Sequence, residues 1–532
     1  MKETSLAHSA SKAGLGTLAS RILGYIRDML IASYFGAGTS ADAFYVAFRI
    51  PNLLRNLLGE GALSASFIPV FSQYLVKKEE DAWEIARITF SILLVLLSLL
   101  TLLGIAITPF IVRIIAPGFI SLPDKFSLTV TLTRIMFPFF LLICLAALAT
   151  GILNSLRSFF VPAVAPSMLS LGEIFSVIVL VPLMGGSVKG LACGVLLGGL
   201  GQLLAQVPSV IKFWPRRGTR THFVGTRQSV GTPGGSGFLK LIFSHPGVKK
   251  IGILMLPATL GLGVFQINAF VDTICASYLI EGSPTALYYA NRLMQLPLAI
   301  FATSVATVSL PAMSAFMANK DKEGLLKTLS TSVKMIFFLL MPASIGLIVL
   351  GKPIVTLLFQ RGRFDVFATN LTTQALLFYS MGLISYGGVK VVASAFYSMQ
   401  DTKTPLQVSI IAMLLNIELN FIFMRFMGVG GLALATAISS TVNVSLLLFL
   451  LRRRIGKLQG GETLNFFWRM GVISGVIGII CFILLKLGLN VFFQVILGIG
   501  LSIVVLFSLG FLFRFKEARE LWGQIAQIKR FT

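Results

Sequence analysis

Fourteen predominantly apolar stretches run through this 532-residue chain, and they constrain its fold more than any other feature. Each is about 20 or more residues long, the length at which an α-helix crosses ~30 Å of hydrocarbon. Short loops join nearly all of them, so neighbouring helices should run antiparallel. We predict an all-α polytopic membrane protein whose fourteen transmembrane helices lie approximately at 14–36, 42–76, 86–116, 127–154, 160–184, 188–213, 249–280, 285–318, 326–350, 366–398, 404–427, 429–452, 465–487 and 490–514.

Composition excludes the soluble classes of protein. Charged residues make up 12% of the chain and hydrophobic residues 56%, whereas soluble domains carry about 25% charged residues. The net charge of +24 would suggest nucleic-acid binding in a soluble protein. Here we attribute it to an excess of Lys and Arg in cytoplasmic loops, and we expect no nucleic-acid partner. The four cysteines lie in apolar stretches without metal-type spacing, so no disulfide framework is expected.

The loops indicate the orientation. An even number of spans places both termini on one side, and the loops of that side are rich in Lys and Arg. From Lys212 to Lys250 there are eight Lys and Arg residues and no acidic residue. We therefore predict that both termini are cytoplasmic. The segment 214–248, rich in Gly, Thr, Ser and Arg, is typical of a flexible linker.

An internal repeat links the two halves of the chain. The segment 43–49 matches 286–292 at an offset of 243, and 188–192 matches 429–433 at an offset of 241. We predict that spans 1–6 and 7–12 are two parallel copies of one unit around a central cavity. The predicted domains are an N-lobe at 1–213, the basic linker at 214–248, a C-lobe at 249–454, and two extra helices with a cytoplasmic tail at 455–532.

Charged residues interrupt the first two spans. A charge at membrane depth is unfavourable by ~2.5 kcal/mol or more, so such residues usually face a cavity and serve function. The alternative is a set of ion pairs that only hold helices together. The sum of these charges is positive, which favours function, because a set of pairs would balance. The charges are Arg21, Arg27, Arg49 and Arg55 against Asp28, Asp42 and Glu60.

Spacing places several of these residues on one face of the second span. At 100° per residue, spacings of seven and eleven bring Asp42, Arg49, Asn56 and Glu60 into a polar stripe, with Asn52 at its margin. In the second repeat, Arg292 corresponds to Arg49. Guanidinium groups bind phosphate through paired hydrogen bonds and stay protonated. The pattern therefore favours a phosphorylated, membrane-borne anion as ligand, and it contains no nucleotide-binding loop or catalytic triad.

A second polar cluster is predicted in the later spans. Asp272 lies deep in the seventh span, Asn416 and Asn420 share one face of the eleventh, and Thr436 lies in the twelfth. Their oxygens suit a hard cation such as Na⁺, and hydrogen bonding between helices is the alternative. Glu173 occupies the repeat position of Asn416, and we assign it no role beyond pairing or proton coupling.

Short motifs are spread along the chain. They are Ser20-Arg21-Ile22-Leu23-Gly24 with Arg27-Asp28, Phe35-Gly36-Ala37-Gly38, Asp42-Ala43-Phe44, Pro51-Asn52-Leu53-Leu54-Arg55, Glu60-Gly61-Ala62, Tyr288-Tyr289-Ala290-Asn291-Arg292-Leu293-Met294 and Asp401-Thr402-Lys403-Thr404-Pro405. Together they resemble the MviN/MurJ family, the bacterial lipid II flippases of the multidrug/oligosaccharidyl-lipid/polysaccharide exporter superfamily. The resemblance covers essentially the whole chain.

The resemblance implies a function. A member of this family would be a multi-pass transporter of the bacterial cytoplasmic membrane, not an enzyme, that moves lipid II, the undecaprenyl-pyrophosphate-linked peptidoglycan precursor, for cell-wall synthesis and cell shape. We expect a monomer whose partners are lipid II, membrane lipids and the cell-wall synthesis machinery. Spans 13 and 14 would form a groove for the lipid tail. The expected substrate-binding residues are Ser20, Arg21, Arg27, Asp28, Asp42, Arg49, Asn52, Arg55, Glu60 and Arg292.

The resemblance also implies a sodium site, and no other cofactor is expected. The site would comprise Asp272, Asn416, Asn420 and Thr436 with the backbone carbonyl of Leu432. Asn420 replaces an acid found in some members, which leaves a weaker or absent site as the alternative. Asn291 likewise stands where the family often has an acid.

Three other functions remain open at this point. The first is export of another lipid-linked glycan or of drugs on the same fold, although a drug exporter would not need four cavity arginines. The second is a membrane enzyme acting on polyprenyl phosphates, which would need a catalytic base or metal-binding acids near a membrane face. The third is a scaffold without transport, against which the intact set of arginines argues.

Overall fold

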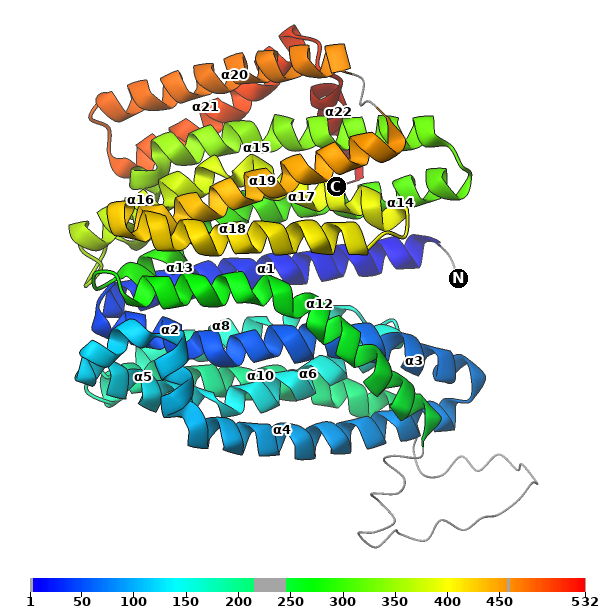
Figure 1. Cartoon of the computed structure of the whole chain (residues 1–532), viewed down its shortest axis with the longest axis vertical. Coiled ribbons are helices and arrows are strands. Elements are labelled where there is room, and N and C mark those ends of the chain that lie inside the picture. The colour runs from blue at the N-terminus through cyan, green and yellow to red at the C-terminus, as the bar shows by residue number, and fades with distance from the viewer. Residues whose placement is uncertain (1–2, 215–244, 457–459, 532) are drawn as a thin grey trace, which may run out of the picture. The chain divides into compact units, whose positions relative to one another are not determined.

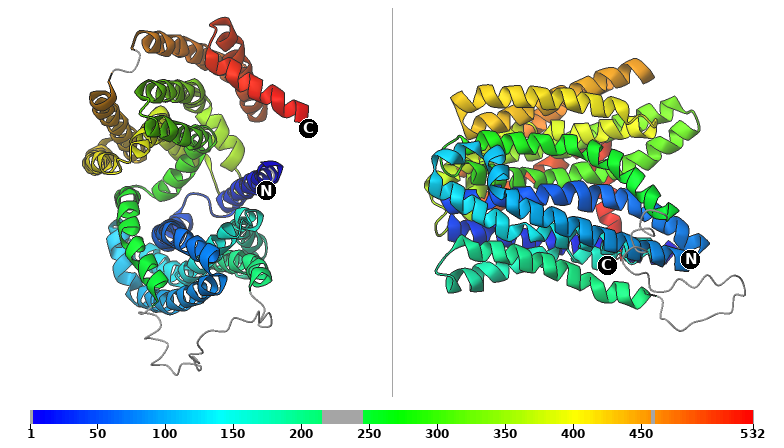
Figure 2. Two further views of the ribbon diagram at one scale, coloured as in Figure 1. Left: turned by 90° about the vertical axis from the view of Figure 1, so that its right-hand side faces the viewer. Right: turned by 60° about the horizontal axis from the view of Figure 1, so that its bottom comes forward.

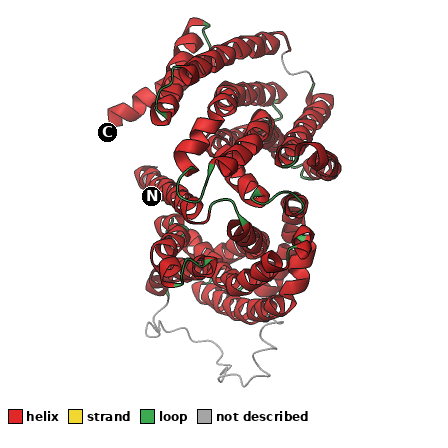
Figure 3. Cartoon of the chain, turned by 90° about the vertical axis from the view of Figure 1, so that its left-hand side faces the viewer, coloured by secondary structure: helices red, strands yellow, loops and turns green. Residues whose placement is uncertain are grey.

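The computed structural model of the chain describes residues 3–214, 245–456 and 460–531. Within these ranges it leaves undescribed the side chains of residues 3–15, 17–18, 60, 460–464 and 524–531 and most of those at 256–265. Every regular element of the described part is a helix (Figure 3), which confirms the predicted all-α class. The predicted linker, 214–248, falls outside the description except at its two ends.

The chain divides into two compact units, and each is a bundle of long helices (Figures 1 and 2). Unit 1 comprises 1–35 and 43–266, and unit 2 comprises 36–42 and 267–532. The division therefore falls inside helix α12 (Pro246–Ser277). It also assigns the segment between α1 and α2 to unit 2.

The helices of unit 1 follow the predicted spans. They are α1 (Glu3–Phe35), most of α2 (Thr39–Leu54), the π-helix η1 (Arg55–Leu63), α3 (Ser64–Lys77), α4 (Glu79–Ile115), the 3₁₀-helix η2 (Pro117–Ser121), α5 (Pro123–Met136), α6 (Pro138–Ser155), α7 (Phe160–Val164), α8 (Ser167–Phe175), the π-helix η3 (Ser176–Leu180), α9 (Val181–Leu183) and α10 (Val188–Phe213).

The helices of unit 2 begin within α12. They continue with α13 (Ser283–Pro297), the π-helix η4 (Leu298–Ala302), α14 (Thr303–Ala318), α15 (Lys322–Phe359), α16 (Val366–Met381), α17 (Leu383–Ser398), α18 (Lys403–Met427), α19 (Val429–Ile455), α20 (Gly460–Lys486), α21 (Val491–Leu512) and α22 (Lys516–Phe531).

Local sequence explains where several helices begin and break. Asp321 and Asp365 precede α15 and α16, and their carboxylates accept the backbone N–H of Gly324 and Ala368 at 2.8 Å each, as N-caps do. Pro138 is the first residue of α6. Its missing N–H costs nothing there, because the first N–H groups of a helix have no acceptor within the helix.

Ten helical stretches of the described residues are long and apolar enough to cross a membrane. The pair α16 and α17, bent by 42° at its break, adds an eleventh if it counts as one span. The other three predicted spans are helical but are not among these stretches of the described residues; they coincide with α1, α2–η1–α3 and α12. In the first two, charged and other polar side chains lower the mean hydropathy, and these include the residues predicted to serve function.

The second predicted span is not a regular α-helix, and this corrects the predicted polar stripe. From Arg55 to Leu63 the backbone is π-helical, with wider turns and i→i+5 hydrogen bonds. Positions were projected at 100° per residue, which holds only as far as Leu54. Asp42 and Arg49 still share one helix face, because both precede the π segment. The projection does not determine the face on which Asn56 and Glu60 lie. Gly59 and Gly61, which weaken a regular helix, lie within the π segment.

Candidate functional site

Arg27 on α1 is the only arginine that is buried among the described side chains, at 7% exposure. Its Nε and one terminal nitrogen donate to Oδ1 of Asp28 at 3.0 and 2.7 Å. The same Nε lies 3.1 Å from Oε2 of Glu173 on α8. Charge-assisted bonds of this kind are about twice as strong as neutral ones. A phosphate oxygen would seek the same N–H groups that these two carboxylates now occupy.

Close packing of α8 fixes Glu173. A Cβ added at Gly172 would lie 2.5 Å from the backbone nitrogen of Gly198 on α10, so a larger residue cannot be accommodated there. This approach clamps α8 onto α10, and Glu173 is 2% exposed. Sequence reasoning assigned Glu173 no specific partner. Its place in an apolar span, at the repeat position of Asn416, was the available signal.

The other predicted substrate residues of unit 1 are more open. Arg21 on α1 is exposed, and Ser20, Arg49, Asn52 and Arg55 are half-buried. Arg55 donates to Oδ1 of its neighbour Asn56 at 3.2 Å. The side chain of Glu60 lies outside the described residues.

Asp42 has a structural role that the sequence did not suggest. Its carboxylate is fully buried and accepts the backbone N–H of Gly282 at 2.8 Å and of Thr285 at 3.1 Å, together with the Thr285 hydroxyl at 2.6 Å. Gly282 stands at the N-cap of α13 and has no capping side chain. Asp42 therefore caps this helix from 240 residues away, satisfying donors that would otherwise be orphaned.

Arg292 lies on α13 of unit 2 and is half-buried. Its neighbour Asn291 accepts a hydrogen bond from Gln295 one turn later. The Asn291 amide therefore makes a local contact along the same helix.

The predicted cation-site residues come together in unit 2. Asn420 Nδ2 donates to Asp272 Oδ1 at 2.7 Å and to Asn416 Oδ1 at 3.1 Å. Asn416 Nδ2 in turn reaches the hydroxyl of Thr436 at 3.4 Å. That hydroxyl donates to the carbonyl of Leu432 at 3.0 Å. All five predicted residues thus form one chain of hydrogen bonds.

One atom of this cluster favours a cation. Oδ1 of Asn420 is buried and has no hydrogen-bond partner among the described residues, which is unfavourable unless something else satisfies it. Among the described residues no group of three or more His, Cys, Asp or Glu could hold a metal ion. A donor set with one carboxylate and neutral oxygens suits a monovalent hard cation better than a divalent metal.

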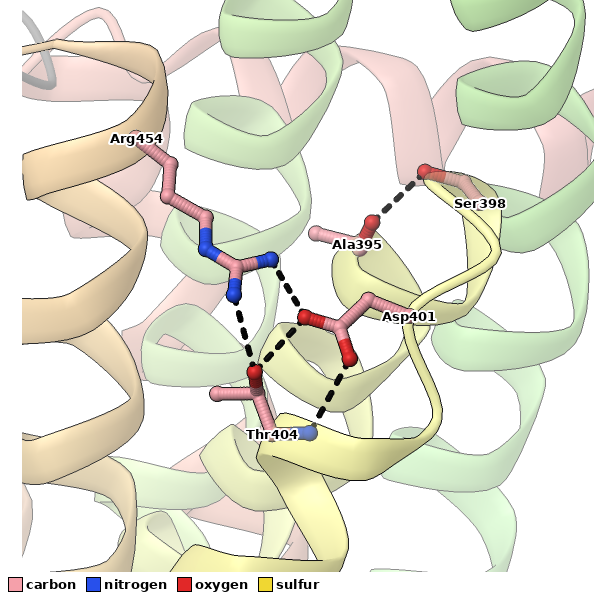
Figure 4. A network of polar contacts seen from close by, with 5 residues as sticks. All are labelled: Ala395, Ser398, Asp401, Thr404 and Arg454. Carbon is pink, nitrogen blue, oxygen red and sulfur yellow. Dashed lines mark hydrogen bonds and ion pairs between the residues drawn. The ribbon is translucent and has the colours of Figure 1, made fainter.

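A third polar cluster, absent from the predictions, lies at the junction of α17, α18 and α19 (Figure 4). Asp401 accepts the N–H and the hydroxyl of Thr404 at 3.0 and 2.6 Å and pairs with Arg454. Burial opposes ionisation of this carboxyl, but the bonds from Thr404 and Arg454 outweigh it and lower the pKa of Asp401 to about 2. Asp401 therefore stays charged at neutral pH and fastens the start of α18 to the end of α19.

The model of the MurJ family, described as lipid II flippase MurJ, matches residues 31–508. The chain belongs to the MurJ family. The "Probable lipid II flippase MurJ" of Vibrio cholerae is 39% identical over 442 residues, covering 81% of this chain and 80% of the relative. The "Lipid II flippase MurJ" of Burkholderia cenocepacia is 35% identical over 444 residues, covering 83% of each.

One solved structure agrees with this membership in the MurJ family, and a second shows the same fold. A structure titled "Lipid II flippase MurJ, inward closed conformation" superposes with a TM-score of 0.76 at 28% identity, covering 94% of this chain and 98% of that one. An inward-facing MATE family transporter of the MOP superfamily, at 17% identity and a TM-score of 0.64, shares the fold. The match covers 83% of this chain and 96% of the transporter chain.

Proposed function

We propose that this chain is a flippase that moves lipid II from the inner to the outer leaflet of the bacterial inner membrane for peptidoglycan synthesis. Membership of the MurJ family carries the proposal, and the buried Arg27 centre supplies chemistry that suits it. The chain is a transporter rather than an enzyme. Its many apolar helices and its family place it in the inner membrane as a multi-pass protein.

Arginines are the groups we assign to the diphosphate of the substrate. Arg27 presents a guanidinium held in orientation by Asp28 and Glu173, and such a group binds phosphate oxygens in pairs. We also assign Arg21, Arg55 and Arg292 to binding of the diphosphate. Because Arg27 has two carboxylate partners of its own, its charge does not lie unpaired in an apolar interior, which would be strongly unfavourable. The diphosphate would displace these partners, and their return would help to release it.

The fourteen-span layout with two parallel repeats remains our proposal, and the helix bounds support it. The helices α4 and α15 begin at Glu79 and Lys322, 243 residues apart. The π-helices η1 and η4 begin at Arg55 and Leu298, again 243 apart. Such π segments frequently mark functional sites, and their recurrence suggests two corresponding flexible points in an alternating-access cycle. The domain bounds predicted from the sequence rest on the same layout.

Orientation with both termini in the cytoplasm also remains a proposal. The excess of Lys and Arg on that side of the predicted topology supports it. A monomeric state and contact with the cell-wall synthesis machinery are likewise expectations that follow from the family.

Sodium is the proposed coupling ion. Asp272, Asn416, Asn420, Thr436 and the Leu432 carbonyl would hold it, with Asp272 as the charged ligand. When bound, the ion would supply positive charge that satisfies Asp272 and the unpartnered oxygen of Asn420. Asp272 and Asn420 belong to different helices, so the ion would also strengthen the contact of α12 with α18.

Reconstitution tests the substrate. Purified protein in vesicles is given fluorescent lipid II in one leaflet, and its arrival in the other is followed by quenching. We expect transfer of lipid II but not of a matched polyprenyl monophosphate glycan, because the arginines are assigned to a diphosphate. Transfer of both at equal rates would contradict the arginine assignment. If correctly inserted protein transfers neither lipid, the proposed flippase function is contradicted.

A further inference from the structure

Unit 2 contains a basic site whose residues are not among those assigned to the substrate diphosphate or to sodium. A cavity of about 290 Å³ opens where α15, α20, α21 and the start of α22 meet. This volume is near the lower end of ligand sites, ~300 Å³, and suits a small headgroup rather than a disaccharide-peptide. Its charged lining residues are Lys334, Arg469, Arg514, Lys516 and Glu517.

Charge in this cavity is unbalanced. Four cationic side chains face one carboxyl, and no ion pair within 4.0 Å joins any of these five among the described residues. Glu517 is buried, and this burial raises the pKa of its carboxyl despite the nearby Lys334 and Lys516. The cavity therefore carries a net positive charge that an anion would neutralise.

Local contacts hold the guanidinium group of Arg469, on α20, in a fixed orientation. Its Nε donates to Asn465 Oδ1 at 3.1 Å, and one terminal nitrogen reaches the carbonyl of Phe513 at 3.5 Å. The guanidinium also lies 6.0 Å from the centre of the Phe513 ring, within reach of a cation–π contact. A guanidinium has five N–H donors, so Arg469 keeps donors for a ligand while its orientation is held.

Part of the cavity lining is apolar and belongs to the buried core of the unit. Phe466 and Phe515, which line it, belong to a buried cluster that also contains Phe338 and Ala518. A Cβ added at Gly510 would lie only 3.0 Å from Cβ of Ala518, so α22 packs closely against the end of α21. Arg514, at the turn between them, has a φ of 57°, a conformation uncommon outside glycine. This tight turn brings Arg514 and Lys516 to the cavity.

Aromatic residues indicate how deep in the membrane the cavity lies. Trp468, next to Arg469, is 74% exposed, and Trp522 on α22 is 53% exposed. The ring of Trp522 lies 5.8 Å from that of Phe507 on α21. Exposed tryptophans gather at the level of lipid headgroups, and the outward face of α21 nearby carries the exposed Leu512. A ligand in the cavity would have its charge at headgroup depth and acyl chains beside α21.

We propose that this cavity binds the phosphate headgroup of an anionic bilayer lipid of the phosphatidylglycerol type, with Arg469 and Arg514 as its principal contacts. Basic pockets between transmembrane helices are known recognition sites for anionic headgroups. The same phosphate chemistry would fit free inorganic phosphate, but the exposed tryptophans and adjoining apolar surface favour a lipid. The bound lipid would join α20, α21 and α22 to α15.

The test measures lipid binding to detergent-purified full-length protein by native mass spectrometry. The cavity variant is R469Q/R514Q, and the matched control R452Q/R453Q removes the same charge from the exposed end of α19. We expect about 10-fold or greater weakening of phosphatidylglycerol binding in the cavity variant, little change in the control, and no binding of phosphatidylcholine. Inorganic phosphate at 100-fold excess should not displace the lipid.

Three outcomes would overturn the proposal. Equal weakening in both double variants would indicate general charge attraction, and unchanged binding in the cavity variant would exclude the site. Complete displacement by inorganic phosphate would assign the cavity to free phosphate. If R469Q/R514Q does not fold, the exposed Lys516→Gln variant replaces it, with R452Q as its control, and an unchanged affinity would again exclude the site.

Discussion

Nε of Arg27 on α1 lies 3.1 Å from Oε2 of Glu173 on α8, and both side chains are almost wholly buried. The helix α8 is itself clamped to α10 by the approach of Gly172 to Gly198. The ion pair therefore connects the helix carrying the predicted substrate arginine to a rigid part of its own unit. A substrate phosphate that takes the place of Glu173 would remove this ion pair between α1 and α8. Binding would then change the contact between two helices as well as fill a site.

Substitution of Glu173 by Gln should tighten binding and slow transport. The amide keeps the shape of the side chain but removes the charge that competes with phosphate for Arg27. We expect several-fold higher affinity for a lipid diphosphate together with slower release, since return of the carboxylate would no longer help the ligand to leave. Binding is measured by isothermal titration and transport in reconstituted vesicles. Weaker binding in this variant would show that Glu173 orients Arg27 more than it competes.

Removal of the carboxylate of Asp42 should destabilise unit 2. Asp42→Ala leaves two backbone N–H groups at the start of α13 without acceptors, at a cost of about 1–3 kcal/mol for buried donors. Thermal unfolding in detergent measures the loss. Asp321→Ala is the matched control, because that aspartate caps the exposed start of α15, where water can replace it and the cost should be about 1 kcal/mol or less. An equal loss of stability in the two variants would contradict the proposal that Asp42 is a buried cap of α13.

The ion pair between Asp401 and Arg454 should make stability depend on pH at the acid end. The pKa of Asp401 is lowered to about 2, below its ordinary value of 3.8. A lowered folded-state pKa means that the stabilisation is complete above pH 4 and is lost as the pH falls through 4 towards 2. Wild type and Asp401→Asn should therefore differ at pH 7 and converge near pH 2. The difference should be about 1 kcal/mol or less, because Arg454 is half exposed.

Replacement of Asn420 by Asp should strengthen sodium binding. The new carboxylate would stand beside Asp272, which now accepts a hydrogen bond from Asn420 at 2.7 Å. Two like charges at this distance repel each other, and a cation bound between them would relieve that repulsion. We expect thermal stability to rise with Na⁺ more steeply in Asn420→Asp than in wild type, and not at all in Asp272→Asn. K⁺ at the same ionic strength is the control. Stability that is indifferent to Na⁺ in all three proteins would exclude the site.

The sequence predicted the helices well because long apolar runs determine them directly. It also predicted residues that the structure brings together, since Asn416 and Asn420 share a helix face by spacing alone and Asp272 is conspicuous in an apolar span. Relations between distant segments could not be predicted in this way. Hydropathy and periodicity describe one helix at a time, so they do not indicate that Glu173 meets Arg27.

The cap and the π-helix were also beyond sequence reasoning. A single aspartate in a polar stripe gives no sign that it caps a helix 240 residues later, as Asp42 does. Projection at 100° per residue assumes regular geometry, and the π segment beginning at Arg55 violates that assumption. Residues after Arg55 were therefore assigned to a face on geometry that the chain does not adopt.

Transport of lipid II by this chain can be tested in cells that are depleted of their own flippase and supplied with this chain. The quantity measured is the accessibility of the lipid-linked peptidoglycan precursor at the outer face of the cells. A membrane-impermeant enzyme that cleaves the exposed precursor gives the readout. We predict restored cleavage with wild type, loss with Arg27→Ala and with Arg292→Ala, and partial retention with Arg27→Lys, which keeps the charge without the paired geometry. Immunoblots establish that each variant reaches the membrane. Full cleavage with both alanine variants, or none with inserted wild type, would contradict the account.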